Sequence, residues 1–389
     1  MTAPATAPPL RAPTPQAPKL VVGGRSIPVV LPNRRDPRLK LSAVVMTLHV
    51  LGQTLLDFKV SIAQIAVSIV FCALVEAAVI LRQQHLLAWP ASGMLTGSSV
   101  ALLLRASGTE HGDWWSLNGI EFFVLAGLVS LLSKHLIRPA GRHLFNPSNL
   151  GIVWALLVIG PNHVFPQYLW WGPNQLGVAS AYAVILVGAV WILPKVRMVT
   201  MALAFLVTFA VLVGGLALSG ASFIAIWQQG PITGASYWSN VVVSPEVLVF
   251  VFFMMSDPQT APRASRARIL YGAATAVVAA ALLSFQPTEF GIKVAILSSL
   301  TVVCALVPLI ERAASHLHRG ARPAPDGLAP ASAVPDRPLR RRLAVAARRP
   351  AVVAAAIIAV AAPVDTALLA GNEQLILIER GQTGDRNAQ

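Results

Sequence analysis

The feature that most constrains this chain is a series of about eleven apolar segments, each bounded by charged residues, Pro or Gly. They cover roughly residues 41–57, 60–81, 92–104, 118–134, 147–160, 176–194, 199–218, 243–256, 268–284, 291–310 and 351–371. A helix needs about 20 apolar residues to cross the hydrocarbon of a membrane. Charged residues make up only 12% of the chain, which excludes a soluble enzyme and a disordered protein. The sequence therefore predicts an all-α polytopic membrane protein.

The positive charges alternate between the two sides of these segments. Of the 30 Lys and Arg residues, 25 lie in the N-terminal region and the even-numbered connections; on the other side are Lys59, Arg105, Lys293, Arg380 and Arg386. The positive-inside rule then predicts a plasma (inner) membrane protein with its N-terminus in the cytoplasm and its C-terminus outside. The net charge of +14 is thereby explained by topology, and the lipid bilayer, not nucleic acid, is the expected partner.

Composition divides the chain into four parts. Residues 1–40 form a cytoplasmic segment rich in Pro, Ala and Arg, and residues 41–312 form a ten-span core. Residues 313–349 are a flexible Arg/Pro-rich linker, and residues 350–389 hold an eleventh helix and an outer tail.

The ten-span core divides into two halves of five helices. An odd number of spans per half inverts the second half relative to the first. The third, fifth and eighth segments are short for a full span, as expected for broken helices. Short segments at matching positions of inverted halves point to a binding site near the midplane.

Three polar residues in these segments are candidates for an ion or polar pathway, namely Glu76, Thr96 and Asp257. A charge at the centre of a spanning helix costs at least about 2.5 kcal/mol. Glu76 is therefore either a protonated or Arg-paired structural residue, or a group that handles ions or protons. Asp257 precedes Pro258, so it either caps the next segment or lines an ion or cofactor pocket.

Polar residues also cluster where the fifth segment begins. Asn146 suits an N-cap and Pro147 suits the first helical turn, while His143, Asn146 and Asn149 recur at a spacing of three and share roughly one face. These groups either cap the helix or bind a ligand at its end. The sequence has no HExxH, CxxC, phosphate loop or nucleophile elbow, so neither a catalytic residue nor a metal site is predicted. Whether the chain is an enzyme stays open.

Several short motifs follow one another in a characteristic order between residues 38 and 312. They are Met94-Leu-Thr-Gly97, Lys134-His-Leu136, Phe145-Asn-Pro-Ser148, the run Phe253 to Pro262, Tyr271-Gly272, and a stretch from Ile296 to Glu311. Their order and spacing resemble the RnfD/NqrB family, the ten-span membrane subunits of ion-translocating electron-transport complexes. The extra C-terminal helix and the Arg-rich linker look like the members found in enediyne antibiotic gene clusters.

The resemblance implies a redox subunit that passes electrons through flavin and has other membrane redox subunits as partners. Family members bind riboflavin non-covalently near the Asn-Pro helix start, which implies a role for Asn146, although His143 replaces the family's preceding Asn; Asn149 stays a cofactor-binding candidate from its spacing alone. They also attach FMN to the Thr of an S-G-A-T motif between the fifth and sixth spans. That connection, residues 161–172, contains no Ser or Thr here. Related sequences end instead at Ser222 and Ser236, between the seventh and eighth spans.

Two other functions fit the same sequence. A transporter or channel could move a small solute, an ion or a natural product along a path lined by Glu76 and Asp257. A membrane scaffold could recruit cytoplasmic partners of a biosynthetic pathway through the Arg-rich linker.

Overall fold

The computed structural model describes residues 18–22, 25–31, 36–138, 141–167, 175–225 and 229–316. Most of the predicted linker and the whole predicted eleventh helix lie outside these residues. The described part is mainly helical, and six of its helices are long and apolar enough to cross a membrane. The predicted class, an all-α polytopic membrane protein, is therefore confirmed.

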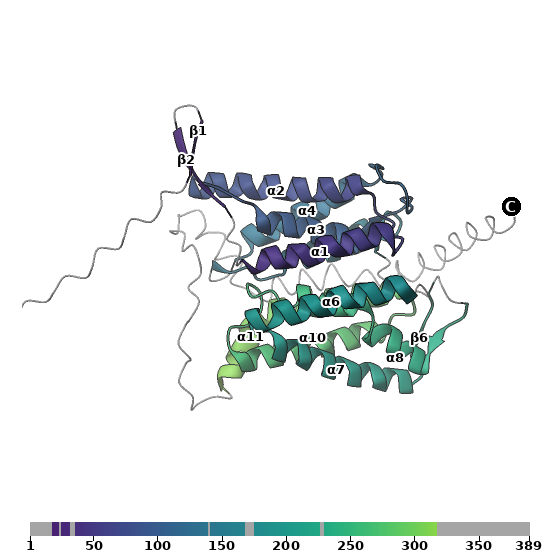
Figure 1. The fold of residues 1–389 in the computed structure, drawn as a ribbon. Helices are drawn as coiled ribbons and strands as arrows, with labels where there is room; N and C mark the ends of the chain where they lie inside the picture. The colour runs from purple at the N-terminus through teal and green to yellow at the C-terminus, as the bar shows by residue number, and fades with distance from the viewer. Residues whose placement is uncertain are drawn as a thin grey trace, which may run out of the picture.

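The helices form two layers (Figure 1). The first layer contains α1 (Pro37–Thr54), α2 (Ile62–Gln84), α3 (Ala91–Leu103), α4 (Ile120–Leu136) and α5 (Pro147–Trp154), which continues as the π-helical turn η2 (Ala155–Ile159). The second layer contains α6 (Gln175–Val196), α7 (Val199–Leu218), α8 (Gly234–Val242), α9 (Pro245–Val249), the π-helical turn η3 (Phe250–Met254), α10 (Ser265–Leu283) and α11 (Glu289–His316).

Helix contacts repeat between the two layers. In the first, α2 packs on α3 and α4, and α4 packs on α5; in the second, α7 packs on α8 and α10, and α10 packs on α11. Helices α1 and α6 pack against each other across the boundary. Lys40, in the first turn of α1, lies over the ring of Trp191 near the end of α6, so these two helices run antiparallel. This arrangement agrees with two inverted halves.

Two of the three segments expected to be short are short: α3 has 13 residues, and α5 with η2 covers only Pro147–Ile159. The expectation is wrong for the eighth segment, because α8, α9 and η3 together cover Gly234–Met254 and are long enough to cross a membrane. Both α5 and α9 begin with Pro, have a side-chain cap from Asn146 or Ser244, and end in a π-helical turn. The eighth segment is a broken helix, because α8 ends at Val242 and α9 restarts at Pro245. π-Helical turns inside helices are frequent at functional sites.

Short strands, which the sequence did not predict, join some of the connections. A three-stranded sheet contains β1 (Lys19–Val22), β2 (Arg25–Val30) and β3 (Leu87–Ala88), with β1–β2 antiparallel and β2–β3 parallel. Two antiparallel pairs follow, β4 (Leu104–Ala106) with β5 (Val164–Pro166) and β6 (Ser222–Phe223) with β7 (Ile232–Thr233). The N-terminal segment is therefore partly ordered, since β2 finds its partner β3 only after α2.

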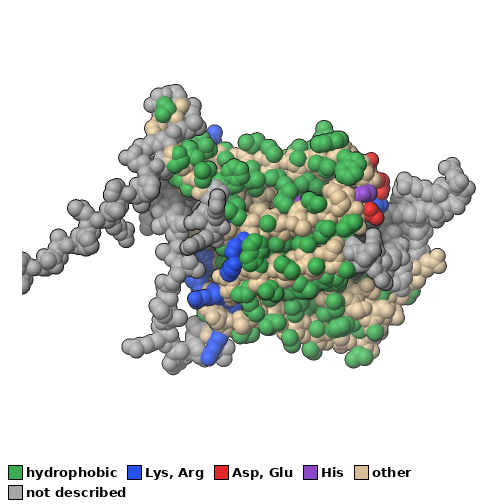
Figure 2. Space-filling view, viewed as in Figure 1, with side chains coloured by type: hydrophobic (Ala, Val, Ile, Leu, Met, Phe, Trp, Pro, Cys, Tyr) green, Lys and Arg blue, Asp and Glu red, His purple; other side chains and the backbone are tan. Residues whose placement is uncertain are grey.

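Side chains divide by charge along the molecule. Figure 2 shows Lys and Arg gathered at the end where β1 and β2 lie, a broad hydrophobic surface between, and acidic side chains at the opposite end. We call the first end the basic end; the start of α1 with Lys40 and the end of α6 with Lys195 meet there at Trp191. It corresponds to the side predicted to be cytoplasmic.

Candidate functional site

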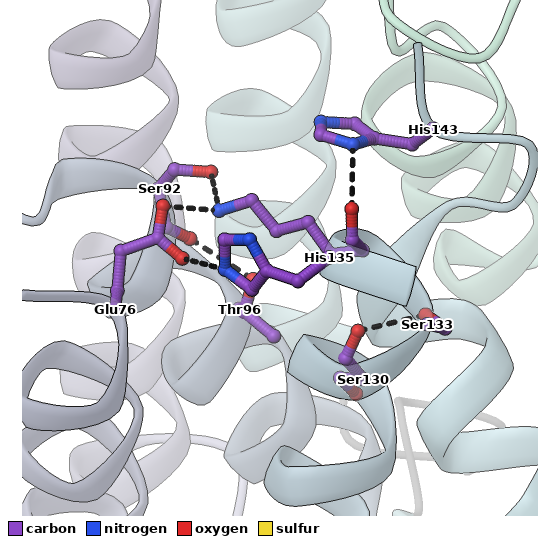
Figure 3. A network of polar contacts seen from close by, with 8 residues as sticks. Glu76, Ser92, Thr96, Ser130, Ser133, His135 and His143 are labelled. Atoms are coloured by element: carbon purple, nitrogen blue, oxygen red, sulfur yellow. Dashed lines mark hydrogen bonds and ion pairs between the residues drawn. The ribbon is translucent and has the colours of Figure 1, made fainter. Parts of the chain in front are cut away.

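Glu76 is the centre of a buried polar cluster between α2, α3 and α4 (Figure 3). The Lys134 ammonium donates to Glu76 Oε1 at 2.6 Å and to Ser92 Oγ at 2.8 Å. His135 Nε2 lies 3.1 Å from the other carboxylate oxygen. The side chains of Glu76 and Lys134 are only 7% and 6% exposed. We refer to Glu76, Ser92, Lys134 and His135 as the Glu76 cluster.

Small residues on α3 bring this cluster together. A Cβ atom on Gly93 would lie 2.6 Å from the Cys72 carbonyl oxygen and 2.7 Å from Glu76 Cβ, so α3 can approach α2 this closely only without a side chain there. The close approach places Ser92 within reach of Lys134. Thr96, the predicted pathway residue, lies one turn further and donates its hydroxyl proton to the Ser92 carbonyl oxygen at 2.9 Å. It therefore borders the cluster without contacting Glu76.

The partner of Glu76 differs from the one considered from sequence. The positive-inside count treats Lys134 as a connection charge, and Arg82 is the cation nearest to Glu76 in the sequence. In the structure Lys134 lies inside α4 and is 5% exposed. A buried carboxylate needs a hydrogen-bonded cation to offset its lost hydration, and only a residue buried on a facing helix can supply one here.

His135 has one ring nitrogen in use and one without a partner. Nε2 faces Glu76, whereas Nδ1 is buried and has no hydrogen-bond partner. Nδ1 is thus the one polar atom of the Glu76 cluster that is open to an added proton or water molecule among the described residues.

The helix start at α5 both caps that helix and ties the two halves together. Asn146 Oδ1 accepts from the Asn149 backbone N–H at 3.1 Å, while its Nδ2 donates to the Met254 carbonyl oxygen at 2.9 Å, at the end of η3. Asn149 Nδ2 donates to the Leu297 carbonyl oxygen at 3.0 Å and to Thr301 Oγ1 at 2.9 Å, both on α11. The capping interpretation is therefore confirmed for Asn146.

These contacts bear on the expected flavin. A flavin ring needs hydrogen-bond donors for its carbonyl oxygens, and the amide donors of Asn146 and Asn149 already bind protein acceptors. Asn149 Oδ1 is buried without a partner, which leaves one acceptor. In this arrangement the two side chains do not fit a flavin.

His143 lies near the Glu76 cluster rather than beside Asn146. Its Nδ1 is 3.3 Å from the Lys134 carbonyl oxygen, as Figure 3 shows. Burial, followed by the positive charges of Lys134 and Arg138, lowers the pKa of His143 to about 4. His143 is therefore neutral at physiological pH.

Asp257 follows the π-helical turn η3 by three residues and does not cap the next helix. Its Oδ1 accepts from the Gln259 backbone N–H at 2.9 Å within a local turn, and α10 begins only at Ser265. Burial raises the pKa of Asp257. The same turn is held by Arg142, which donates to the carbonyl oxygens of Pro258 and Ala261 at 2.9 and 2.8 Å. Asp257 influences Lys134 through its charge, without a direct contact.

The two Gly-Ala-Ser sequences come together in the structure. Ser222 on β6 pairs in register with Thr233 on β7, where the second sequence starts. Ser222 and Ser236 are both exposed. The sequence does not predict that they lie side by side, because strands β6 and β7 have two residues each and are too short to show an alternating pattern.

A second buried charge cluster was missed by sequence reasoning. The Lys293 ammonium lies 2.6 Å from Glu289 Oε1 and 2.9 Å from Glu246 Oε1, and the three side chains are 6%, 6% and 11% exposed. We call these residues the Lys293 cluster. With Gln167 and mostly apolar side chains, Glu246 and Lys293 line a cavity of about 30 Å³. The spacing of four residues between Glu289 and Lys293 is typical of an ion pair on one face of a helix. The positive-inside count instead treats Lys293 as a connection charge.

A polytopic helical core with two buried Lys–Glu clusters defines a membrane protein that holds charged side chains inside its helix packing. Residues 163–319 match the model of the NQR2, RnfD, RnfE family, so this part of the chain carries the family's pattern and the predicted resemblance is confirmed. The match supports a membrane subunit of ion-translocating complexes, in contact with lipid and membrane partners. No curated protein matches the chain.

The matched range covers β5 to the end of α11. It includes Asp257, Ser222, Ser236 and the Lys293 cluster, but neither Asn146 nor the Glu76 cluster.

Proposed function

We propose that the protein is a membrane subunit that moves protons, and that the Glu76 cluster takes them up and releases them. The observation that carries this proposal is the buried Glu76 carboxylate, held between Lys134 and a His135 ring whose Nδ1 is buried and unpartnered. Buried ionisable residues in spanning helices are the usual components of proton relays.

The ligand chemistry favours a proton over a metal cation. Sodium and other hard cations prefer several oxygen ligands, whereas an ammonium and an imidazole already face the two Glu76 oxygens. A cation entering there would be repelled by Lys134. Within the described ranges, no group of three His, Cys, Asp or Glu residues could hold a metal ion.

The residues allow a simple exchange. A proton taken up at His135 Nδ1 makes the ring an imidazolium, and its Nε2 proton can then pass along the 3.1 Å contact to Glu76. That transfer leaves a neutral ring and a neutral carboxyl group. Lys134 then keeps its contact with Ser92 at 2.8 Å but no longer faces a negative charge. Because the Lys134 ammonium favours the ionised form of Glu76, the neutral Glu76 carboxyl group can release its proton again.

The experiment is proton flux into liposomes that contain the full-length protein, driven by a pH gradient and read by an internal pH dye. His135→Gln removes the imidazole ring and keeps a polar side chain, and it should reduce flux at least tenfold. Glu76→Gln should do the same if the variant folds. Glu121→Gln, at an exposed position in the first turn of α4, is the matched control and should leave flux unchanged.

Flux that is unaffected by both His135→Gln and Glu76→Gln would overturn the proposal. Flux that follows a sodium gradient at constant pH, and not a proton gradient, would also contradict it. Uptake that requires an added organic solute would instead favour a transporter on the same scaffold.

A second candidate is a redox subunit that carries flavin, favoured by the family match over residues 163–319. A visible spectrum of the protein purified in mild detergent tests it. Flavin bands that are lost when the protein is denatured and separated from small molecules would support a non-covalent site. Bands that survive denaturation and disappear in Ser222→Ala or Ser236→Ala would support covalent attachment, whereas a spectrum without flavin bands would reject this candidate.

A further inference from the structure

Two lysines meet on one tryptophan at the basic end, away from both buried clusters. The ammonium of Lys40, from α1, lies 5.0 Å from the ring centroid of Trp191, and that of Lys195, from α6, lies 5.5 Å from the same centroid. Both distances are within the range of a cation–π contact. Trp191 is 44% exposed, so the group is open to its surroundings.

The two lysines repel each other. The nearby Lys195 ammonium, together with slight desolvation, lowers the pKa of Lys40. Among the residues that the structure describes, no ion pair joins either lysine to a carboxylate. Trp191 attracts both cations through its ring face but carries no charge to neutralise them. The group therefore offers two positive charges to an anion from outside the chain.

The surface beside these lysines is apolar. On α6, Val187 and Val190 are 68% and 77% exposed, and on α1, Met46 and Val50 are 43% and 59% exposed. They lie on the two helices that carry Lys195 and Lys40, further from the helix ends than the two lysines. An occupant of this surface thus meets positive charge at one end and hydrocarbon along the rest.

We propose that Lys40, Lys195 and Trp191 bind the phosphate of one anionic phospholipid, whose acyl chains lie along α1 and α6. The charges, the interfacial Trp and the exposed apolar side chains match the three parts of such a lipid, namely headgroup, interface and chains. A free phosphate ion would use the charges alone. The predicted orientation places this site in the cytoplasmic leaflet, where anionic lipids attract basic residues.

The site also joins the two halves of the molecule. Lys40 belongs to the first half and Lys195 to the second, so one phosphate neutralises the repulsion between them. A bound lipid should therefore stabilise the packing of α1 on α6.

Native mass spectrometry of the full-length protein in detergent tests the proposal, with dioleoyl phosphatidylglycerol as the probe. Lys40→Gln/Lys195→Gln should weaken binding of the first lipid about 30-fold, since each lysine near a headgroup contributes about fivefold. Trp191→Leu keeps the apolar surface and should weaken it by about threefold. Arg82→Gln/Arg312→Gln removes the same charge elsewhere at the basic end and should change it by less than about twofold.

Three results would overturn the proposal. One is equal lipid binding by the wild type and the double lysine variant. Another is an equal loss in the arginine control, which would show a general charge effect. The third is displacement of the lipid by millimolar inorganic phosphate, which would show a simple anion site. Dioleoyl phosphatidylcholine, a zwitterionic lipid with the same chains, should bind wild type and double variant alike.

Discussion

The Glu76 cluster and the Lys293 cluster use the same pair of residue types in different ways. In the first, one carboxylate faces two nitrogen groups, Lys134 and His135, from a neighbouring helix. In the second, one ammonium faces two carboxylates, Glu246 and Glu289. The first therefore has two nitrogen groups for one carboxylate, while the second has one lysine for two carboxylates.

This difference predicts that the two clusters respond differently to the loss of a charge. In the Glu76 cluster, a change in protonation of His135 can compensate for a change in charge nearby. In the Lys293 cluster, the loss of the ammonium removes the cation that both carboxylates contact. Removing one partner of a buried pair costs more than the intact pair contributes.

The largest effect is therefore expected for Lys293→Met. The variant leaves two buried carboxylates without their shared cation and should lose about 3–5 kcal/mol of unfolding free energy. Thermal unfolding in detergent, followed by tryptophan fluorescence or by loss of monodispersity, measures this. Lys59→Met removes an exposed lysine paired with Glu110 and should cost at most about 1 kcal/mol. An equal loss in both variants would remove the contrast between buried and exposed pairs.

Lys134→Met should have a smaller effect than Lys293→Met. It leaves one carboxylate, Glu76, and His135 at 3.1 Å can become protonated to replace the missing charge. We expect a loss of about 1–3 kcal/mol. The double variant Lys134→Met/His135→Gln removes both cations and should lose clearly more than Lys134→Met. If the double and single variants were equally stable, His135 would not compensate, and the distinction between the clusters would fail.

The sequence predicts some members of these clusters and not others, for physical reasons. Glu76 is predicted because a carboxylate in an apolar run is costly. Its partner Lys134 is not, because Lys134 lies 58 residues away and, close to Arg138 in the chain, is counted with the connection charges. Asn146 as a cap follows from local rules. Its partner Met254 and the Asn149 contact with Leu297, 148 residues away, depend on how the halves pack, which local patterns do not encode.

The Lys293 cluster was missed because positive-inside counting treats every lysine near a segment end as solvated. Glu289 and Lys293 lie in the first turns of α11, where the packing of α9 buries them with Glu246. The strands were missed for a related reason, since β2 and β3 are separated by the whole of α1 and α2.

His143, next to the Glu76 cluster, makes the folding stability of the protein depend on pH. Its pKa is lowered to about 4 in the folded protein, against 6.5 ordinarily, because of burial and then the charges of Lys134 and Arg138. The unfolded chain therefore binds this proton more readily, and stability should fall as the pH drops from about 6.5 toward 4. His143→Asn should reduce that loss by about 1 kcal/mol between pH 7 and pH 5. Unfolding of both proteins at the two pH values measures it, and an unchanged pH dependence would contradict it.

The smallest change in unfolding free energy is expected for Ser92, whose hydroxyl oxygen accepts a hydrogen bond from the Lys134 ammonium at 2.8 Å. Ser92→Ala removes one acceptor from a buried ammonium that keeps its Glu76 partner, so the variant should lose about 1 kcal/mol. Ser133→Ala is a matched control on α4, because the Ser133 hydroxyl donates to the Ser130 carbonyl oxygen outside the cluster. If Glu76 exchanges protons, Ser92→Ala should also change proton flux by a few-fold, since Lys134 is then held by Glu76 alone; Ser133→Ala should not. A stability loss without any change in flux would show that Ser92 only supports the packing of α3 against α4.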